Sequence, residues 1–214
     1  APSPFGGWLD LASKALAAVD GVALFVAFPR SHSDTPAELA GERITYLTFD
    51  SDKKGRRSSD SLADRLSRLI KYADPDIVHV FGTEFGHAHT AISLCVAEDR
   101  QFVVSIQGLL SVYAQHYSTG LPVSVLFKFT FRDLIKRENI YRQQRSLRAR
   151  GSQEIDSIVK TRHAIGRTSW DEACVLQINP QITYHKCNEI LRHEFYGPRW
   201  RLDTCERFTI FVSQ

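Results

Sequence analysis

Several features that would assign this chain to a class are missing. No window of 18 consecutive apolar residues occurs in its 214 residues, so no transmembrane helix is expected. The net charge of +3 is too small for a protein driven as a whole by polyanion binding, although a local basic patch stays possible. The four cysteines show no CxxC spacing, which disfavours a metal site and predicts reduced, mostly buried thiols in a cytosolic protein.

Recognisable motifs are also few. The start, APSPFGGW, has neither the charged residues nor the apolar run of a signal peptide, which supports a cytoplasmic location. No GxSxG elbow surrounds Ser105 or Ser169, so a hydrolase triad is not expected. No GxGxxG turn followed by a ribose-reading acid occurs, which weakens a dehydrogenase interpretation. The 43% hydrophobic content nevertheless suffices for a sizeable core.

The segment DPDIVHVFGTEFGHAH, residues 74–89, is typical of a buried strand that ends in a functional loop. Residues 77–81 form the apolar run, Gly82 ends it, Thr83 can cap the next element, and a helix is expected at 88–97. We expect this strand at the centre of a sheet. The rest of the chain then serves to hold the loop at the sheet's carboxyl edge.

Apolar strands alternate with amphipathic helices along the whole chain. The strands are expected at 22–28, 43–49, 77–81, 101–107, 163–168, 182–185 and 207–212. The helices are expected at 8–19, 60–73 with Asp60 as cap, 88–97, 170–178 with Ser169 as cap, and 188–195, with one or two more in 123–162. Residues 29–41 and 109–122 are expected to be loops. This alternation predicts an α/β fold with an open, mainly parallel sheet covered by helices on both faces.

Polar residues at the expected strand ends are the candidates for chemistry, because ligands of open α/β sheets bind there. Glu84 and His87 could act as acid, base or hydroxyl-binding groups, whereas His89 is better explained as structural. Gln107 and Gly108 end the neighbouring strand and should lie beside the 82–84 loop.

Two further loops are ambiguous. Gly6 and Gly7 open a helix, where an anion such as a diphosphate would be favoured, but on this pattern alone a plain tight turn is the better explanation because the segment is not GxGxxG. Arg167 and Thr168 begin a polar turn that could line a site. The alternatives are a helix cap and a salt bridge between Arg167 and Asp171.

Residues 127–150 form a basic segment with aromatic residues near its start. A basic and aromatic amphipathic segment suits an anionic membrane surface, but also nucleic-acid phosphates or a solvated helix face. Acidic residues within and after it, such as Asp133 and Glu154, dilute the charge, and no motif that reads RNA or DNA occurs. The membrane-surface candidates are Lys128, Arg132, Lys136, Arg137, Arg142, Arg145 and Arg148.

Taken in order, five segments resemble the N-terminal domain of family 4-like glycosyltransferases of the GT-B fold, of the type that makes bacterial surface polysaccharides. They are PSPFGGWLDLASKAL, DIVHVFGTEFGHAHTA, VVSIQGLLSVYAQHY, HAIGRTSWDEACVLQINP and YHKCNEILRHEFY. The resemblance implies two Rossmann-like domains with the active site between them. The N-terminal domain would bind a saccharide or lipid-linked acceptor, and the C-terminal domain a nucleotide-sugar donor. Transfer would be retaining and would need no metal or other cofactor.

Site residues follow from the resemblance by position. Gly6 and Gly7 would face the donor diphosphate, and Glu84 and His87 would belong to the acceptor-side loop. Gln107 stands where many relatives have a histidine beside the donor sugar; it can hydrogen-bond a sugar hydroxyl but cannot titrate. Arg167 and Thr168 would lie at a strand end near the cleft.

The resemblance also divides the chain. Residues 1–205 would form the N-terminal domain without its first strand, and residues 206–214 would be the first strand of the donor domain. We therefore expect no sugar transfer by these residues alone. The open sheet edge and the apolar strand 207–212 predict strand pairing within the chain or between copies. A non-catalytic sugar- or nucleotide-binding α/β module is the alternative.

Overall fold

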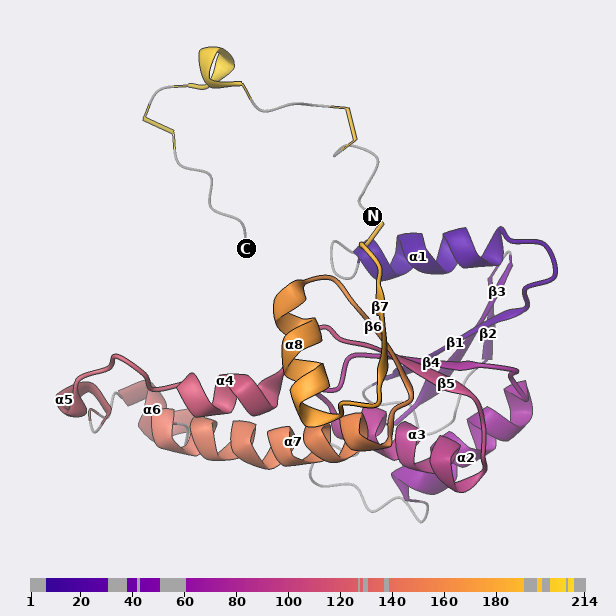
Figure 1. The fold of residues 1–214 in the computed structure, drawn as a ribbon, viewed down its shortest axis with the longest axis horizontal. Coiled ribbons are helices and arrows are strands. Elements are labelled where there is room, and N and C mark those ends of the chain that lie inside the picture. Colours follow the sequence, from indigo (N-terminus) through magenta and orange to yellow (C-terminus); the bar gives the residue numbers. More distant parts are fainter. Residues whose placement is uncertain are drawn as a thin grey trace.

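The computed structural model describes residues 7–30, 38–41, 43–50, 61–126, 128, 131–136, 139–190, 196–197, 201–206 and 208–209. Strands and helices alternate along these residues, and the helices lie around parallel sheets (Figure 1). The predicted α/β, Rossmann-like arrangement is therefore confirmed. None of the described helices is long and apolar enough to cross a bilayer.

The strands of the described residues form two sheets rather than the single sheet that is expected from the sequence. The larger is wholly parallel, with the order β4-β5-β6-β7. Its strands are β4 (Val78–Phe81), β5 (Phe102–Ser105), β6 (His163–Gly166) and β7 (Thr183–Lys186). Within the described residues β4 pairs with β5 alone, so its predicted central place in the sheet was wrong. An apolar run reports burial of a strand's faces but carries no information about its neighbours.

The smaller sheet has the order β1-β3-β2. It contains β1 (Leu24–Pro29) and β3 (Ile44–Phe49), which are parallel, and β2 (Glu38–Ala40), which pairs with β3 in the antiparallel direction. The short β2 lies in a stretch that was predicted to be loop. Three residues are too few to show a period of two in the sequence, so this strand depends on pairing with β3.

Helices cover the sheets and extend beyond them as an arm (Figure 1). Their bounds are α1 (Gly7–Ala17), α2 (Leu62–Ala73), α3 (Gly86–Ala97), α4 (Leu110–His116), α5 (Val123–Leu126), α6 (Phe131–Lys136), α7 (Ile140–Lys160) and α8 (Ser169–Ile178), with a 3₁₀ turn at Leu202–Thr204. The segment 109–122 is thus not simply a loop, because α4 forms in it. Within the described residues of 123–162 the chain forms α5, α6 and α7, three helices rather than one or two.

The α4 helix is held by packing rather than by its own length. Its buried residues Leu110 and Ala114 face α7, and a helix of two turns is stable only with such support. A Cβ at Gly151 of α7 would lie 2.7 Å from the Cα of Ser111, so the two helix backbones are in close contact. Together α4 and α7 form the stem of the arm, and α5 and α6 lie at its far end (Figure 1).

Three predicted helix caps were assigned to the wrong residue. Ser61, not Asp60, caps α2, in a capping box with Asp64. Thr168, not Ser169, caps α8, because its side chain accepts from the Asp171 N–H. Thr83 caps no helix: α3 begins at Gly86, after Phe85, and the Thr83 hydroxyl is directed elsewhere.

Two predicted elements near the end of the chain fall largely outside the described residues. Residues 188–190 of the expected helix 188–195 are described and are not helical. Phe208 and Thr209 of the expected strand 207–212 are described and are not in a strand. The remaining residues of both segments lie outside the described part.

The core lies between the four-stranded sheet and helices α3, α7 and α8. Ile92, Val104, Leu109, Ile158 and Val175 are almost completely buried there. Burying a side chain of this size contributes about 1.5–3 kcal/mol, so this cluster is the main support of the sheet. All four cysteines are free thiols, as expected, but only Cys95 is buried, whereas Cys187 and Cys205 are exposed.

Candidate functional site

The carboxyl ends of the strands in the four-stranded sheet meet at one edge. Hydrogen bonds continue the ladder past the strand ends, from the Gly82 N–H to the Ser105 carbonyl at 2.8 Å and from the Ile106 N–H to the Ile165 carbonyl at 2.8 Å. The loops after β4, β5 and β6 therefore leave the sheet side by side. This edge is where ligands bind in parallel α/β sheets.

Glu84 lies over two glycines of adjacent loops. A Cβ at Gly82 would overlap its Oε2, and a Cβ at Gly108 would lie 3.3 Å from its Oε1. Gly82 also has φ of +78°, which a residue with a side chain adopts only with strain. The carboxylate is half-buried, and this burial raises its pKa despite the nearby N–H groups of residues 83 and 84. Such a group can accept hydrogen bonds from hydroxyls or exchange a proton.

Gln107 follows β5 and lies beside the 82–84 loop, as predicted. Its Cγ is 3.5 Å from the position that a Cβ of Gly82 would take. Its backbone carbonyl accepts from Arg167 Nη2 at 3.2 Å. Within the described part of the chain the side-chain amide of Gln107 makes no hydrogen bond, so both its donor and its acceptor are available to a ligand.

Arg167 follows β6 and joins two loops. Besides its contact with the Gln107 carbonyl, its Nη1 lies 2.7 Å from Oε1 of Glu189, beyond β7. The side-chain salt bridge that was considered with Asp171 is not formed; instead the backbone N–H of Arg167 donates to Asp171 Oδ2 at 3.2 Å. Arg167 therefore braces the edge and its charge is compensated locally by Glu189.

Thr168 is occupied by the start of α8. Its hydroxyl donates to Asp171 Oδ1 at 2.8 Å and accepts from the Asp171 N–H, and Tyr184 donates to the same Oδ1 at 2.7 Å. Burial would raise the pKa of Asp171, but these hydrogen bonds, led by that from Tyr184, hold it below its usual range. The Thr168 side chain therefore shapes the turn rather than facing a ligand.

Two side chains of α7 fasten the loop that carries Glu84. Arg150 donates through Nε and Nη2 to the Glu84 carbonyl, at 2.9 and 2.6 Å, and its guanidinium lies 5.5 Å from the Phe85 ring centroid. Glu154 is fully buried and accepts from the Thr83 hydroxyl at 2.9 Å. The loop after β4 is thus tied to α7 at two points.

Glu154 also holds the start of α4. Its Oε2 accepts from the Leu110 N–H at 3.0 Å, and its Oε1 accepts from the N–H and the hydroxyl of Ser111 at 2.9 and 2.6 Å. In the sequence Glu154 was interpreted only as a charge that dilutes the basic segment. The signal that could have found it is its place among Gly151, Ser157 and Ile158, which share the buried face of α7.

The two histidines near Glu84 are directed away from it. His87 stacks on Phe85, with centroids 5.4 Å apart, and meets the Phe49 ring of β3 at 5.6 Å. Burial lowers the pKa of His87, so it is a neutral imidazole at physiological pH. The structure therefore does not bring His87 and Glu84 together as one catalytic pair.

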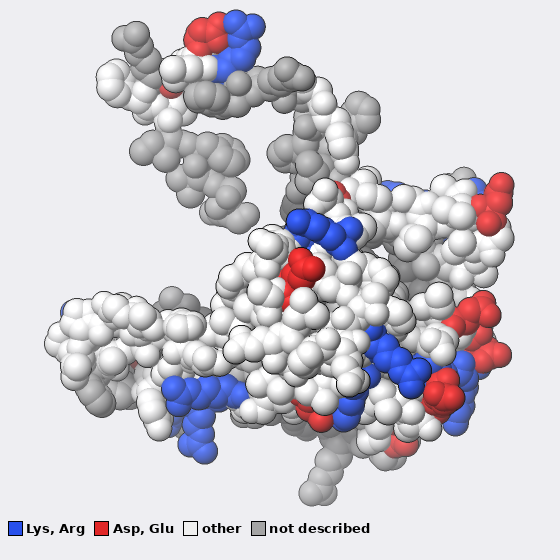
Figure 2. Space-filling model, viewed as in Figure 1, with Lys and Arg blue, Asp and Glu red and all other residues white. Residues whose placement is uncertain are grey.

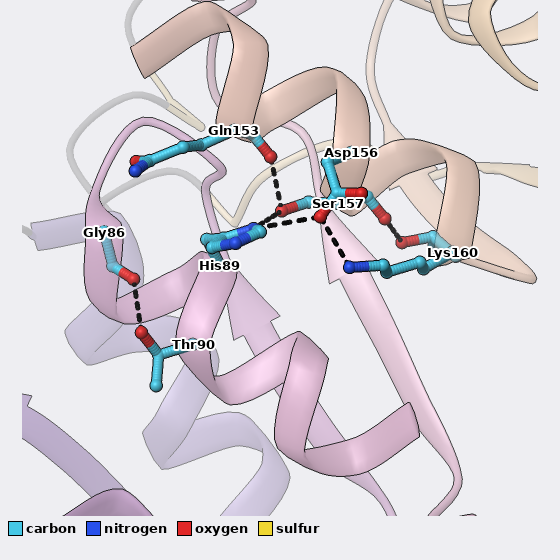
Figure 3. A network of polar contacts seen from close by, with 8 residues as sticks. Gly86, His89, Thr90, Gln153, Asp156, Ser157 and Lys160 are labelled. Atoms are coloured by element: carbon cyan, nitrogen blue, oxygen red, sulfur yellow. Dashed lines mark hydrogen bonds and ion pairs between the residues drawn. The ribbon is translucent and has the colours of Figure 1, made fainter. Parts of the chain in front are cut away.

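His89 has the structural role that was expected. From α3 its Nδ1 lies 3.1 Å from the Ser157 hydroxyl and 3.6 Å from Asp156 Oδ2, while Asp156 is paired with Lys160 at 2.5 Å (Figure 3). Ser157 in turn donates to the Gln153 carbonyl at 2.9 Å. This network joins α3 to α7.

The remaining predicted residues lie away from the edge or outside the described part. Gly7 is the first residue of α1, which packs on β1 and β3 of the other sheet, and Gly6 is not described. Among the basic candidates, Lys128, Arg142, Arg145 and Arg148 are exposed on the arm. The side chains of Arg132 and Lys136, and all of Arg137, are outside the described residues.

Two aromatic residues of the edge were not selected from the sequence. Tyr113 of α4 lies beside Gly108, and its ring is stacked with that of Trp170 of α8. No group of three His, Cys, Asp or Glu side chains placed to hold a metal ion occurs in the part of the chain that the structure describes. No protein-family model matches the chain, and no curated protein matches it.

Proposed function

We propose that the carboxyl edge of β4, β5 and β6 binds a saccharide and forms the acceptor side of a retaining glycosyltransferase that uses a nucleotide-sugar donor. The observation that carries the proposal is the convergence of the Glu84 carboxylate and the Gln107 side chain on Gly82, with the same carboxylate also reaching Gly108. A carboxylate and an amide side by side suit sugar hydroxyls, which both donate and accept hydrogen bonds. The sequence resemblance to family 4-like glycosyltransferases supplies the reaction type.

The charges at this edge favour a neutral ligand over a phosphate. Arg167 is paired with Glu189, and Arg150 is directed at the Glu84 carbonyl. A phosphate would therefore meet the Glu84 carboxylate, while the guanidinium groups of Arg150 and Arg167 are already engaged in hydrogen bonds to other groups. This argues that the nucleotide sugar is not bound here and that the acceptor is.

Ligand-observed saturation-transfer NMR on the 214-residue chain tests the proposal. The probes are methyl pyranosides of glucose, galactose, mannose and N-acetylglucosamine, together with UDP and GDP. We expect transfer to at least one glycoside, and loss of that transfer in Glu84→Gln and Gln107→Ala. A matched control is Gln153→Ala, which removes an exposed amide from α7. Transfer to no glycoside, or to glycosides equally in all four proteins, contradicts the proposal.

The second candidate is a non-catalytic sugar- or nucleotide-binding module. Binding of UDP or GDP without any glycoside would favour it. Release of a nucleoside diphosphate from UDP-glucose or GDP-mannose by the chain alone would instead assign catalysis to these residues, against our expectation. The two assays together distinguish three functions for this chain: the acceptor side of a glycosyltransferase, a nucleotide-binding module, and an enzyme that transfers sugar without any further domain.

The arm supports a peripheral position at an anionic membrane as part of this proposal. Its far end exposes large apolar side chains, Val123 by 67%, Phe131 by 78% and Ile135 by 66%. In Figure 2 most of the described surface that is visible at the end of the arm is uncharged, and Lys and Arg side chains lie beneath its stem. Apolar residues beside a row of cations suit the boundary between lipid headgroups and acyl chains. A membrane there would bring a lipid-linked acceptor close to the site.

Co-sedimentation with vesicles of phosphatidylcholine containing phosphatidylglycerol tests this part. We expect the triple change Arg142→Gln, Arg145→Gln and Arg148→Gln, and separately Phe131→Ser, to reduce the bound fraction. The control with the same loss of charge is Lys71→Gln, Arg162→Gln and Lys186→Gln, all at exposed positions away from the arm. Equal loss in the control and the arm variant would show a nonspecific charge effect and would contradict membrane docking by the arm.

A further inference from the structure

Tyr113 and Trp170 form a partly exposed aromatic pair at the candidate site. Their ring centroids are 6.1 Å apart and their planes differ by only 13°. Tyr113 comes from α4 and Trp170 from the first turn of α8, so the pair joins two helices that follow adjacent strands. The residues are 48% and 46% exposed. Large aromatic rings that are about half exposed at the edge of a sheet offer a flat apolar surface to a ligand.

The pair is continuous with the polar part of the site. A Cβ at Gly108 would lie 3.3 Å from Tyr113 Cε2 and also 3.3 Å from Glu84 Oε1. The carboxylate and the Tyr113 ring therefore approach the same glycine, so the aromatic pair adjoins the polar groups of the site. This combination of apolar wall and few polar groups is typical of small-molecule sites.

The apolar surface continues from Tyr113 along the arm. A shallow hollow of about 430 Å³ is lined by Tyr113, His116, Tyr117 and Leu147. The Tyr117 hydroxyl donates to Oε1 of Gln143 on α7, which holds its ring in place. A ligand that reaches beyond Glu84 thus meets a row of aromatic side chains rather than charge.

We infer that the Tyr113–Trp170 pair is a second sugar subsite, so that the ligand of this edge is an oligosaccharide rather than a monosaccharide. This inference rests on the proposed saccharide binding. One ring would place its hydroxyls at Glu84 and Gln107, and the adjoining ring would lay its apolar C–H face on the aromatic pair. Aromatic rings suit this task because they combine a flat apolar face with polar edges.

A packing contact between α4 and α8 is the simpler role for this pair, and the experiment separates the two roles. Tyr113→Ala and Trp170→Ala are compared with Tyr113→Phe and Trp170→Phe, which keep an aromatic ring. Tyr141→Ala, a 69% exposed aromatic residue at the start of α7, is the matched control. Circular dichroism and thermal unfolding establish that each variant is folded.

Binding is measured by calorimetry with methyl glycosides and with the β-linked disaccharides and trisaccharides of the same sugars. We expect the alanine variants to bind the oligosaccharides about tenfold more weakly, while monosaccharide binding stays within twofold of the unaltered protein. The phenylalanine variants and Tyr141→Ala should retain oligosaccharide binding. In a Trp8→Phe, Trp200→Phe background, oligosaccharides should also change the fluorescence of Trp170.

The possible failures are distinguishable. If monosaccharides bind through Glu84 and the alanine variants keep full oligosaccharide affinity, the second subsite is wrong and the proposed function stands. If both ligand classes lose affinity equally in the alanine variants, the pair shapes the edge and the inference is also overturned. If no saccharide of either length binds, the proposed function itself fails. Quenching of Trp170 by UDP alone would assign the pair to a nucleobase and would overturn the inference.

Discussion

The buried Glu154 carboxylate accepts a hydrogen bond at 2.9 Å from the hydroxyl of Thr83, a residue 71 positions earlier in the chain. The same carboxylate holds the first two residues of α4. Since Arg150, one turn earlier on α7, holds the Glu84 carbonyl, a single helix sets the position of the candidate site. A buried carboxylate is costly unless all its oxygens are satisfied, and here hydroxyl and amide donors satisfy both.

Replacement of Glu154 should therefore loosen the site as well as the fold. We expect Glu154→Ala to lower the free energy of unfolding by about 3 kcal/mol, because it leaves two N–H groups and two hydroxyls without their partner. Urea unfolding followed by circular dichroism measures this. Hydrogen exchange should also rise at residues 83–85 and 110–111, and the exposed Gln153→Ala on the same helix serves as control. Unchanged exchange in both segments would contradict the bracing role.

Gly151 should be needed for the contact between α4 and α7. An added Cβ would lie 2.7 Å from Ser111 Cα and 3.0 Å from Ser111 N, which are backbone atoms that cannot rotate away. We expect Gly151→Ala to destabilise the protein by roughly 1–3 kcal/mol in thermal or urea unfolding, although alanine is the better helix former. The control is Gly86→Ala in the first turn of α3, where a Cβ would meet no atom within 4 Å. Equal stability of the two variants would disprove the close contact.

Glu84 should show opposite effects on stability and on binding. Because burial raises the pKa of its carboxyl in the folded protein, the folded state binds more protons than the unfolded state just above the ordinary pKa. The ionised group therefore costs stability at neutral pH, and Glu84→Gln should be at least as stable as the unaltered protein at pH 7. The difference in stability between Glu84→Gln and the unaltered protein should vanish well below the ordinary pKa of glutamate, because the glutamine and the protonated Glu84 are then both neutral.

The same change should abolish glycoside binding, because the amide replaces an oxygen acceptor with a donor. In the unaltered protein, binding should weaken as the pH falls through the raised pKa of Glu84. Calorimetry at several pH values between 7 and 4, paired with urea unfolding at each, measures both effects. A Glu84→Gln protein that is less stable at pH 7 would show that the carboxylate serves the fold.

His79 should make the fold sensitive to acid. Its Nε2 lies 2.7 Å from the Ser105 hydroxyl, its ring stacks on Phe81 with centroids 4.0 Å apart, and burial lowers its pKa from 6.5 to about 4. The unfolded chain therefore binds more protons than the folded one between these two values. The contribution of the neutral His79 imidazole to stability is complete above pH 6.5 and is lost as the pH falls towards 4.

Between pH 7 and pH 4.5 this loss amounts to about 2 kcal/mol. His79→Gln, which stays neutral throughout, should reduce the fall in the free energy of unfolding by that amount. Parallel urea titrations of both proteins at the two pH values provide the measurement. If the two proteins lose stability equally over this interval, another group is responsible for the acid sensitivity.

Local patterns accounted for much of the fold. The apolar runs around Val80, Val104 and Ala164 marked the strands of the larger sheet, and the Leu spacing around Leu66 marked α2, because burial of one face imposes a period on the sequence. Helix ends were less certain. Several polar residues adjoin each helix start, and only the backbone path selects Ser61 and Thr168 as the caps.

The parts of the site that were not predicted depend on distant contacts. The strand after Pro75 was placed at the sheet centre, whereas β4 lies at an edge of the sheet within the described residues. His87 was grouped with Glu84, yet its ring contacts Phe49 of the other sheet. Neither result follows from local spacing, because both depend on which elements pack together.

By itself the sequence determined the α/β class, the parallel strands and the polar loops after β4, β5 and β6, since these follow from periods of hydrophobicity and from glycines at strand ends. Only the tertiary structure decided which polar groups face one another. Glu154 and Thr83, or Tyr113 and Trp170, come from segments that no local pattern links. Glu154 meets Thr83 because α7 packs beside the loop after β4, and Tyr113 meets Trp170 because α4 and α8 follow adjacent strands. The spacing of apolar residues along the sequence shows that a side chain is buried against some other residue. Only the packed fold identifies that residue.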